Sequence, residues 1–433
     1  TSMADHTIYV GTCFGDNDSP THAILRMSLI DGDLHMVAMN NPHPFGERRI
    51  NYFRTSTEGI NPGWIIPHET GEGKRVLYVV MEDDSGFVQA YSVANKSSSP
   101  TPVGGAMPTG GTHPCFASLD ATRRWMFVAH YTSGTISVLP MDGAGATQTI
   151  QFRATPSRPL LSELADRQEA PHAHCVIPHP SNRWVVACDL GLSTVFSFSF
   201  NEQTGILEGG MDDERHYRGD PKDGCRHCCW NKAGTILYVT NELSCTITAL
   251  SFDTDSGILG KRRVTVPIAG VDLDRSHHRG LSDLVLHPNG RLLFVGCRST
   301  QPSGCIAVFT VEEEPQSDEF FVELKLQGFA VTLGEVPRNF KLIAEDNSEA
   351  NSGDANDGDV GPSWLVVGNQ ETKSVECFEV CVNGDGGEGR CNMNDNYNHW
   401  SNSLPVTRYL RHTSSISTAP YKPCNIASFD AIN

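Results

Sequence analysis

Charged side chains at the two ends of one predicted hairpin could together bind an anion and move a proton. Arg226 opens a strand that runs to about residue 230, and Glu242 follows the returning strand over residues 236–240. An antiparallel pair brings these two ends together, so we expect both side chains on one face of the fold. A guanidinium pairs with carboxylate or phosphate, and a glutamate can exchange protons.

The same geometry places further polar residues at matching strand ends. His172 and His174 alternate onto one face if they open a strand, as residues i and i+2 do. Asp189 and Arg298 end second strands as Glu242 does, and Arg338 opens another inner strand. We expect these side chains to converge on one solvent-filled mouth of a central channel. A histidine there could transfer protons near neutral pH. The His172 and His174 pair could instead hold a metal, but two adjacent arginines oppose a cation, and we expect no metal.

A repeated pattern supplies the strands that must position these groups. An apolar strand, a turn, a second apolar strand ending in a polar pair and a further alternating strand recur about every 50–70 residues. The clearest copies cover 226–252 and 281–309; others cover 113–139, 174–200, 61–91 and 339–378, and 7–27 begins midway through a copy. Seven such copies predict an all-β, seven-bladed propeller of four-stranded antiparallel blades.

The even spread of the copies predicts one domain over residues 1–433, although the length alone would suggest two or three. The acidic stretches 345–359 and 383–398 are expected to be loop insertions in the seventh copy. The ring should close through its termini. Residues 414–419 or 425–428 would add a strand to the blade begun by residues 7–11, which covers the sheet edges.

Charge and composition exclude several kinds of partner. A net charge of −18 makes nucleic acid an unsuitable partner, because binding phosphates needs a positive field. The sequence contains no run of about 18 apolar residues, so we expect no membrane-spanning helix. Many of the 14 cysteines stand among apolar strand residues, which is typical of reduced thiols, and we expect a cytoplasmic protein. No WD dipeptide marks an interaction propeller, and no obligate protein partner is indicated.

Five motifs together resemble the seven-bladed lactonase family. They are Pro171-His-Ala-His174, Cys225-Arg-His227, Tyr238-Val-Thr-Asn-Glu242, His287-Pro-Asn-Gly290 and Pro337-Arg-Asn-Phe340. That family includes propeller-type 6-phosphogluconolactonases and the fungal carboxy-cis,cis-muconate lactonizing enzymes. The resemblance implies a site without a cofactor, with His174, Arg226, Glu242 and Arg298 as catalytic residues. At Arg298 this chain reads Gly-Cys-Arg-Ser, where the family usually has Ser-Asn-Arg-Gly.

The resemblance thus implies a lactone hydrolase acting on a small anionic lactone, with 6-phosphogluconolactone as first choice. His172, His227, Arg338 and Asp189 are expected to bind the carboxylate or sugar phosphate of the substrate. Ring closure of a carboxymuconate is the alternative reaction. The alternative to an enzyme is a binding protein, in which the propeller is kept as a platform and the catalytic activity is lost.

Overall fold

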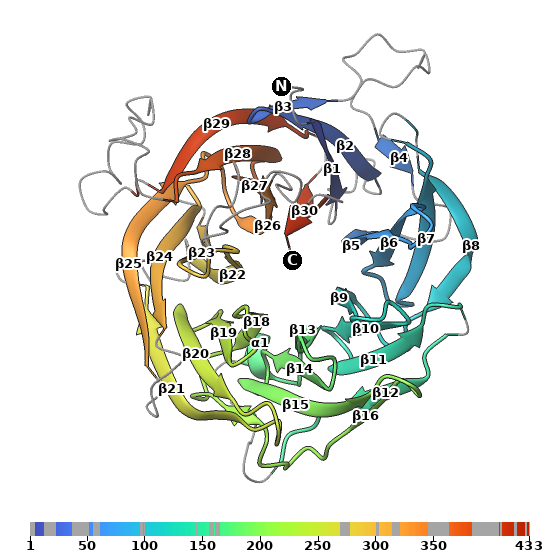
Figure 1. Ribbon diagram of the computed structural model, residues 1–433, viewed down its shortest axis with the longest axis vertical. Coiled ribbons are helices and arrows are strands. Elements are labelled where there is room, and N and C mark those ends of the chain that lie inside the picture. The colour runs from blue at the N-terminus through green and yellow to red at the C-terminus, as the bar shows by residue number, and fades with distance from the viewer. Residues whose placement is uncertain are drawn as a thin grey trace, which may run out of the picture.

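Seven antiparallel sheets stand around one central axis in the computed structural model (Figure 1), which confirms the predicted seven-bladed propeller. The structure describes residues 5–12, 23–36, 52–54, 61–95, 98, 100–143, 145–155, 160, 165–268, 278–299, 303–313, 321–344, 363–382, 407, 409–419, 422–428 and 431–432. Both acidic stretches, 345–359 and 383–398, lie outside these residues.

The first four blades are numbered in chain order and contain the following strands. Blade 1 contains β1 (Asp5–Thr12), β2 (Ala23–Ile30), β3 (Asp33–Met36), β4 (Tyr52–Arg54) and β30 (Pro423–Ser428). Blade 2 contains β5 (Pro62–Glu69), β6 (Arg75–Met81), β7 (Phe87–Val93) and β8 (Thr101–Pro108). Blade 3 contains β9 (Pro114–Leu119), β10 (Trp125–His130), β11 (Thr135–Pro140) and β12 (Gln148–Gln151). Blade 4 contains β13 (Ala173–Pro178), β14 (Trp184–Asp189), β15 (Thr194–Asn201), β16 (Ile206–Glu208) and β17 (Tyr217–Arg218).

The remaining blades complete the ring. Blade 5 contains β18 (Cys225–Trp230), β19 (Ile236–Asn241), β20 (Thr246–Phe252) and β21 (Leu259–Pro267). Blade 6 contains β22 (His278–Leu286), β23 (Leu292–Ser299), β24 (Cys305–Glu313) and β25 (Val322–Val331). Blade 7 contains β26 (Pro337–Ala344), β27 (Ser363–Asn369), β28 (Ser374–Val380), β29 (Leu410–Ser417) and β31 (Ala431–Ile432). Among the described residues the one helix is α1 (Ala165–Gln168), which is too short to cross a membrane.

Burial decreases from the second strands to the outer strands, and this gradient shows where the blades pack on one another. The second strands β14 and β23 are buried at every position, because sheets pack on both of their faces. The outer strand β8 exposes all but one residue, and β21 is exposed or half-buried at every position after its first. The core therefore lies between neighbouring blades, as where Trp184 of blade 4 meets Phe252 of blade 5.

The chain termini close the ring within blade 1 (Figure 1). Strand β30 pairs antiparallel with β1, with Ile8 opposite Ser428 and Gly11 opposite Asn425. The closure predicted for residues 425–428 is confirmed. The alternative over residues 414–419 is wrong, because β29 pairs with β28 as the outer strand of blade 7. Asn425 also ties the closure to both neighbouring blades, since it accepts from Ile65 N at 3.0 Å and lies 3.4 Å from Asn339.

A β-bulge interrupts the innermost strand of every blade near its start. In six blades one residue is skipped in the pairing with the second strand, and in blade 6 the register shifts twice. A bulge turns one side chain away from the regular alternation. We call the six skipped residues the axial bulge positions: Cys424, Gly63, Cys115, His174, Arg226 and Arg338 in blades 1, 2, 3, 4, 5 and 7.

Truncation after Tyr421 should abolish cooperative folding, because it removes the innermost strand of blade 1 and leaves β1 with an open edge. Soluble yield and urea unfolding measure the effect. A milder variant, Asn425→Ala, removes the acceptor of the buried Ile65 amide and should cost about 1–3 kcal/mol in the free energy of unfolding. A truncated chain with an unchanged unfolding curve would refute closure by β30.

Candidate active site

A fully buried carboxylate, Glu242, gathers three arginines from three different parts of the ring. Arg298 of β23 in blade 6 places Nη2 2.8 Å from Oε1. Arg226, at the bulge of β18, places Nε 2.8 Å from Oε2, as an ion pair without hydrogen-bond geometry. Arg167 of α1 donates from Nη2 to Oε1. The expectation that Arg226 and Glu242 share one face is thereby met.

Electrostatics keep Glu242 ionised. Burial alone would raise the pKa of this carboxyl, but Arg298, Arg167 and Arg226 together lower it to about 2. In return, burial and the neighbouring Arg298 lower the pKa of Arg226 to about 10, although Glu242 opposes this. A group with a pKa of about 2 is a poor proton acceptor near neutral pH. Glu242 therefore orients the arginines and holds their charge.

Backbone geometry explains why Glu242 reaches the axis. Its amide donates to Gly224 O, just before the innermost strand of the same blade. The corresponding amides of Glu82, Tyr131 and Gln370 donate in the same way in blades 2, 3 and 7. The residue after each second strand thus stands beside the axial bulge position of its blade. Gly280 permits this packing, because a Cβ there, at φ +82°, would lie 2.2 Å from Glu242 O.

A second ion pair faces the first from the opposite side of the ring. Arg338, at the bulge of β26 in blade 7, places Nη2 3.6 Å from Oε2 of Glu82 in blade 2. Gly63 makes room for that carboxylate, because a Cβ there would lie 2.7 Å from the same oxygen. Burial raises the pKa of Glu82, and Arg338 and Arg226 counteract the rise. Residues of blades 2, 5 and 7 therefore interact across the axis.

Two histidines, His174 and His227, lie next to this charge cluster. His174, at the bulge of β13, packs edge-on against His227 with ring centroids 5.1 Å apart. Burial, with the nearby charges of Arg226, His227 and Arg338, holds the pKa of His174 well below 6.5, so its imidazole is neutral at pH 7. His227 Nδ1 lies 2.8 Å from Asp283 Oδ1, an oxygen that fixes the orientation of the ring.

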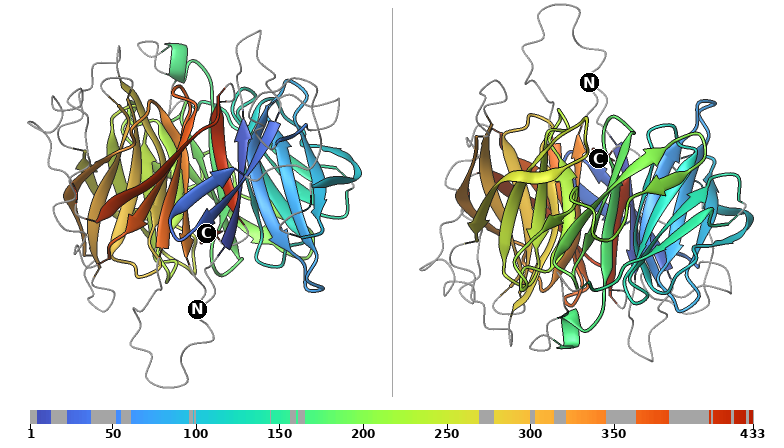
Figure 2. Two further views of the ribbon diagram at one scale, coloured as in Figure 1. Left: turned by 90° about the horizontal axis from the view of Figure 1, so that it is seen from above. Right: turned by 90° about the horizontal axis from the view of Figure 1, so that it is seen from below.

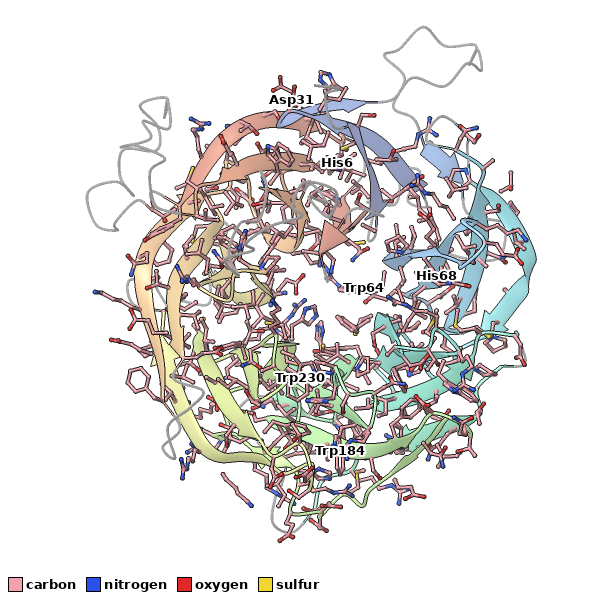
Figure 3. All side chains as sticks on the ribbon, in the orientation of Figure 1. His6, Asp31, Trp64, His68, Trp184 and Trp230 are labelled. Atoms are coloured by element: carbon pink, nitrogen blue, oxygen red, sulfur yellow. The ribbon has the colours of Figure 1, made fainter. Side chains whose placement is uncertain are left out.

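Aromatic rings narrow the channel beneath the charged groups. Trp64 of blade 2 and His227 of blade 5 approach across the axis to 5.9 Å between ring centroids. Phe116 of blade 3 fills the space between them, 4.3 Å from Trp64 and 5.3 Å from His227. Figure 3 labels Trp64 next to the centre of the ring. Arg167 of α1 reaches the charge cluster from the other side, so we expect a ligand to enter from the face that carries α1 (Figure 2).

The cluster has a buried layer and an accessible layer. The side chains of Glu242 and Arg226 are only 0% and 2% exposed. The prediction that both lie in a solvent-filled mouth is therefore wrong. The side chains of Arg298, Arg338 and Arg167 are 11%, 19% and 30% exposed. A ligand thus meets these three arginines first. The buried pair supports them from below.

His172 does not face the cluster as the alternation predicted. The bulge at His174 breaks the i, i+2 relation, since Ala173 and Cys175 pair with the consecutive residues Asp189 and Cys188. The ring of His172 stacks on Tyr131 with centroids 4.2 Å apart. Its Nδ1 lies 2.9 Å from Tyr131 O, and its Nε2 lies 2.9 Å from Glu169. Both nitrogens already have partners, so His172 supports the local chain.

Asp189 is one residue away from the position that we predicted. Its neighbour Leu190, whose amide donates to His172 O, corresponds to Glu242. A shift of one residue in a strand reverses the side-chain direction. The Asp189 carboxylate instead accepts from Leu192 N at 2.7 Å in the following turn. Substrate binding by Asp189 is therefore not supported by its position.

Sequence reasoning missed Arg167, Asp283 and Trp64 as members of the site. Arg167 lies between blades, outside every repeat, so no spacing rule reaches it. Asp283 lies where the register of β22 shifts irregularly, and Asn339 donates to its second oxygen. Trp64 directly follows the bulge at Gly63, as His227 follows Arg226. Matching the bulges between repeats would have found Trp64.

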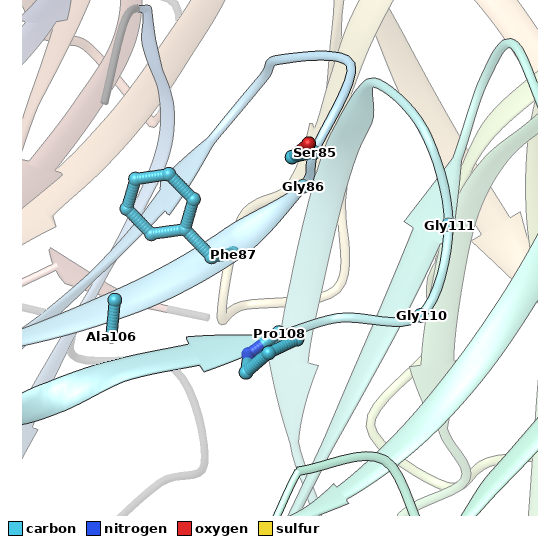
Figure 4. Close-up of a pocket in the computed structure, with 7 residues that line it drawn as sticks. All are labelled: Ser85, Gly86, Phe87, Ala106, Pro108, Gly110 and Gly111. Carbon is cyan, nitrogen blue, oxygen red and sulfur yellow. The ribbon is translucent and has the colours of Figure 1, made fainter. Parts of the chain in front are cut away.

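Neither a metal cluster nor the pocket beside blade 2 competes with this site among the described residues. No three His, Cys, Asp or Glu side chains there come together in a way that could hold a metal ion. A pocket of about 500 Å³ opens at blade 2 and the segment that leads to blade 3 (Figure 4). Its lining comprises Ser85, Phe87, Ala106, Pro108 and three glycines, without a charged side chain to attract an anion.

Comparisons with known proteins agree with this architecture. The family model described as "Lactonase, 7-bladed beta-propeller" matches residues 45–387. A 6-phosphogluconolactonase of Bacillus subtilis is 26% identical over 320 residues, which are 74% of this chain and 80% of that protein. A Pseudomonas aeruginosa periplasmic gluconolactonase has the same fold, with a TM-score of 0.67 at 20% identity over 98% of this chain and 99% of that one.

Glu242→Gln should reduce ligand binding and turnover together, because the neutral amide leaves three arginines to repel one another. The loss of a buried ion-pair partner should also cost about 3–5 kcal/mol in the free energy of unfolding. Calorimetric titration with a small dicarboxylate or sugar phosphate and urea unfolding measure the two effects. Glu379→Gln is the matched control, since its ion pair with Arg411 is at the surface. Loss of turnover with unchanged binding would instead make Glu242 a proton carrier.

Asp189→Asn should change the pH dependence of stability and leave ligand binding unchanged. Burial raises the pKa of Asp189 to about 6, above the ordinary value of 3.8, so the folded state binds a proton more tightly than the unfolded state. Wild-type stability from this group is therefore present below pH 3.8 and is lost as the pH rises through 6. That loss is about 3 kcal/mol. Urea unfolding at pH 4 and pH 7 should show a smaller fall for the variant, and weaker ligand binding would return Asp189 to the site.

Proposed function

The chain belongs to the seven-bladed β-propeller lactonase family, and we propose that it hydrolyses a small anionic lactone, with 6-phosphogluconolactone as the first candidate. One observation carries the proposal. Four arginines meet three carboxylates (Glu82, Glu242 and Asp283) at the axis, which leaves a positive charge within a chain of net charge −18. A localised positive site in an acidic protein attracts and orients a small anion.

Arginines supply the charge stabilisation that lactone hydrolysis requires. When water adds to the carbonyl carbon, negative charge develops on the carbonyl oxygen, and fixed cationic donors lower the energy of that state. Arg298 of blade 6 and Arg338 of the adjacent blade 7 are both partly accessible, so they suit the carbonyl oxygen and a substrate anion. Arg226 lies beneath them and keeps Glu242 in place.

His174 is the proton acceptor that the geometry favours. It stands at an axial bulge position among the arginines, and it is neutral at pH 7. A neutral imidazole can take a proton from the attacking water and return it to the ring oxygen as the carbon–oxygen bond breaks. The ring of His227, which Asp283 holds in place, packs edge-on against His174 and limits how the His174 ring can turn.

A pH-stat assay of the purified protein with 6-phosphogluconolactone and with a carboxymuconolactone tests the proposal. We expect hydrolysis of the phosphorylated lactone above its spontaneous rate, and Arg298→Ala should lower kcat by about 10²–10³. Because the pKa of His174 is lowered, the rate should stay level from pH 8 to pH 6.5 and fall only at lower pH. Turnover of the carboxymuconolactone alone would favour the alternative ring-closing chemistry.

Arg226→Ala should abolish turnover in the same assay. Arg262→Ala, on the outer strand β21 of the same blade, is the matched control and should leave the rate unchanged. No rate above spontaneous hydrolysis for either lactone would reject both reactions. If the protein is inactive on both lactones and a pull-down recovers a stoichiometric protein partner, the binding platform would be favoured.

A further inference from the structure

Arg167 differs from the other arginines of the site in where it comes from. It is carried by α1, in the segment that joins blade 3 to blade 4, whereas Arg226, Arg298 and Arg338 lie on propeller strands. Figure 2 shows α1 standing out from one face of the ring, and Figure 1 places it beside the inner strands β13 and β18. Arg167 therefore approaches Glu242 from the open face of the site.

The backbone of α1 is anchored independently of Arg167. Gln168 is fully buried, and its Nε2 donates to Leu190 O at 2.8 Å and to Ser193 Oγ at 2.9 Å. Glu169 lies 2.9 Å from His172 Nε2 on the same blade. These contacts hold the helix to blade 4 while the Arg167 side chain reaches over to Glu242 of blade 5.

Glu242 does not require Arg167 for its charge to be balanced. Arg226 and Arg298 already place guanidinium nitrogens 2.8 Å from its two carboxylate oxygens. Arg167 brings a third positive charge to one negative charge. Its side chain is also the most exposed of the three, at 30%. The Arg167 guanidinium is accessible at the open face of the site and is not required to balance the charge of Glu242, so it can bind a ligand.

The guanidinium of Arg167 keeps donors for that ligand. Nη2 binds Glu242, and Nε lies 3.4 Å from the Tyr131 hydroxyl. Within the described residues Nη1 has no hydrogen-bond partner. A guanidinium offers five N–H donors in a plane that matches the oxygens of phosphate or carboxylate. Arg167 can therefore donate hydrogen bonds to an anion while its Nη2 remains bound to Glu242.

We propose that Arg167 selects substrates with a second anionic group, such as a phosphate, remote from the reacting carbonyl. This inference rests on the proposed function, since it assumes that the carbonyl lies deeper, among Arg298, Arg338 and His174. The remote anion of such a substrate then points to the open face, where α1 holds Arg167. Tyr131 steadies the guanidinium from blade 3.

Calorimetric titration with 6-phosphogluconate and with gluconate tests the selection, because the two ligands differ only in the remote phosphate. We expect the wild-type protein to prefer 6-phosphogluconate. Arg167→Gln should weaken 6-phosphogluconate binding by about 10–100-fold and change gluconate binding by less than about twofold. Arg167→Lys should restore part of the preference, since it keeps the charge and loses the planar fork.

Two outcomes would overturn the inference: equal binding of both ligands by the wild-type protein, or equal weakening of both by Arg167→Gln. The second would mean that Arg167 only supports Glu242. Arg262→Ala, outside the site, is the control for the general effect of losing a positive charge. The KM values for hydrolysis of 6-phosphogluconolactone and of glucono-δ-lactone give a separate measure. Arg167→Gln should raise KM for the phosphorylated lactone alone. If neither lactone is hydrolysed, the proposed function fails, while the titration still decides whether Arg167 selects the phosphate.

Discussion

The buried charge of Glu242 is the constraint on which the rest of the site depends. An isolated carboxylate in such a place would be neutral, because burial disfavours the ionised form. Three arginines reverse that preference and lower the pKa to about 2. The arginines are held in turn by the carboxylate, since each would otherwise be repelled by the others. A single buried negative charge thus makes a concentrated positive site possible in an acidic protein.

The β-bulges bring these charges to the axis. A regular strand would send Arg226 and His227 to opposite faces of the sheet, and the neighbouring sheets would cover both. The skipped pairing at Arg226, and likewise at His174 and Arg338, directs polar side chains out of the blade instead. Gly63 and Cys424 occupy the same position in other blades. The scaffold therefore repeats one backbone feature and varies the residue that stands there.

The two layers of the site separate support from contact. Arg226 and Glu242 are buried, and the aromatic rings of Trp64 and Phe116 narrow the channel below them. Arg298, Arg338 and Arg167 form the surface that a ligand meets. Low water access strengthens every electrostatic contact within this enclosure. Within it the three arginines hold the pKa of Glu242 at about 2, whereas burial and nearby positive charges keep the imidazole of His174 neutral at pH 7.

The sequence by itself determined the propeller and the meeting of Arg226 with Glu242, because repeat spacing and hairpin geometry are local properties. It left two candidate segments for the closing strand, and the pairing of β30 with β1 decided for residues 425–428. It misplaced His172 and Asp189, since a bulge of one residue reverses the direction of a side chain and leaves no mark on an apolar strand pattern. Tertiary structure alone decided that Arg167 joins the cluster and that Glu242 is buried. Both depend on segments far apart in the chain, which meet only when seven sheets close around one axis.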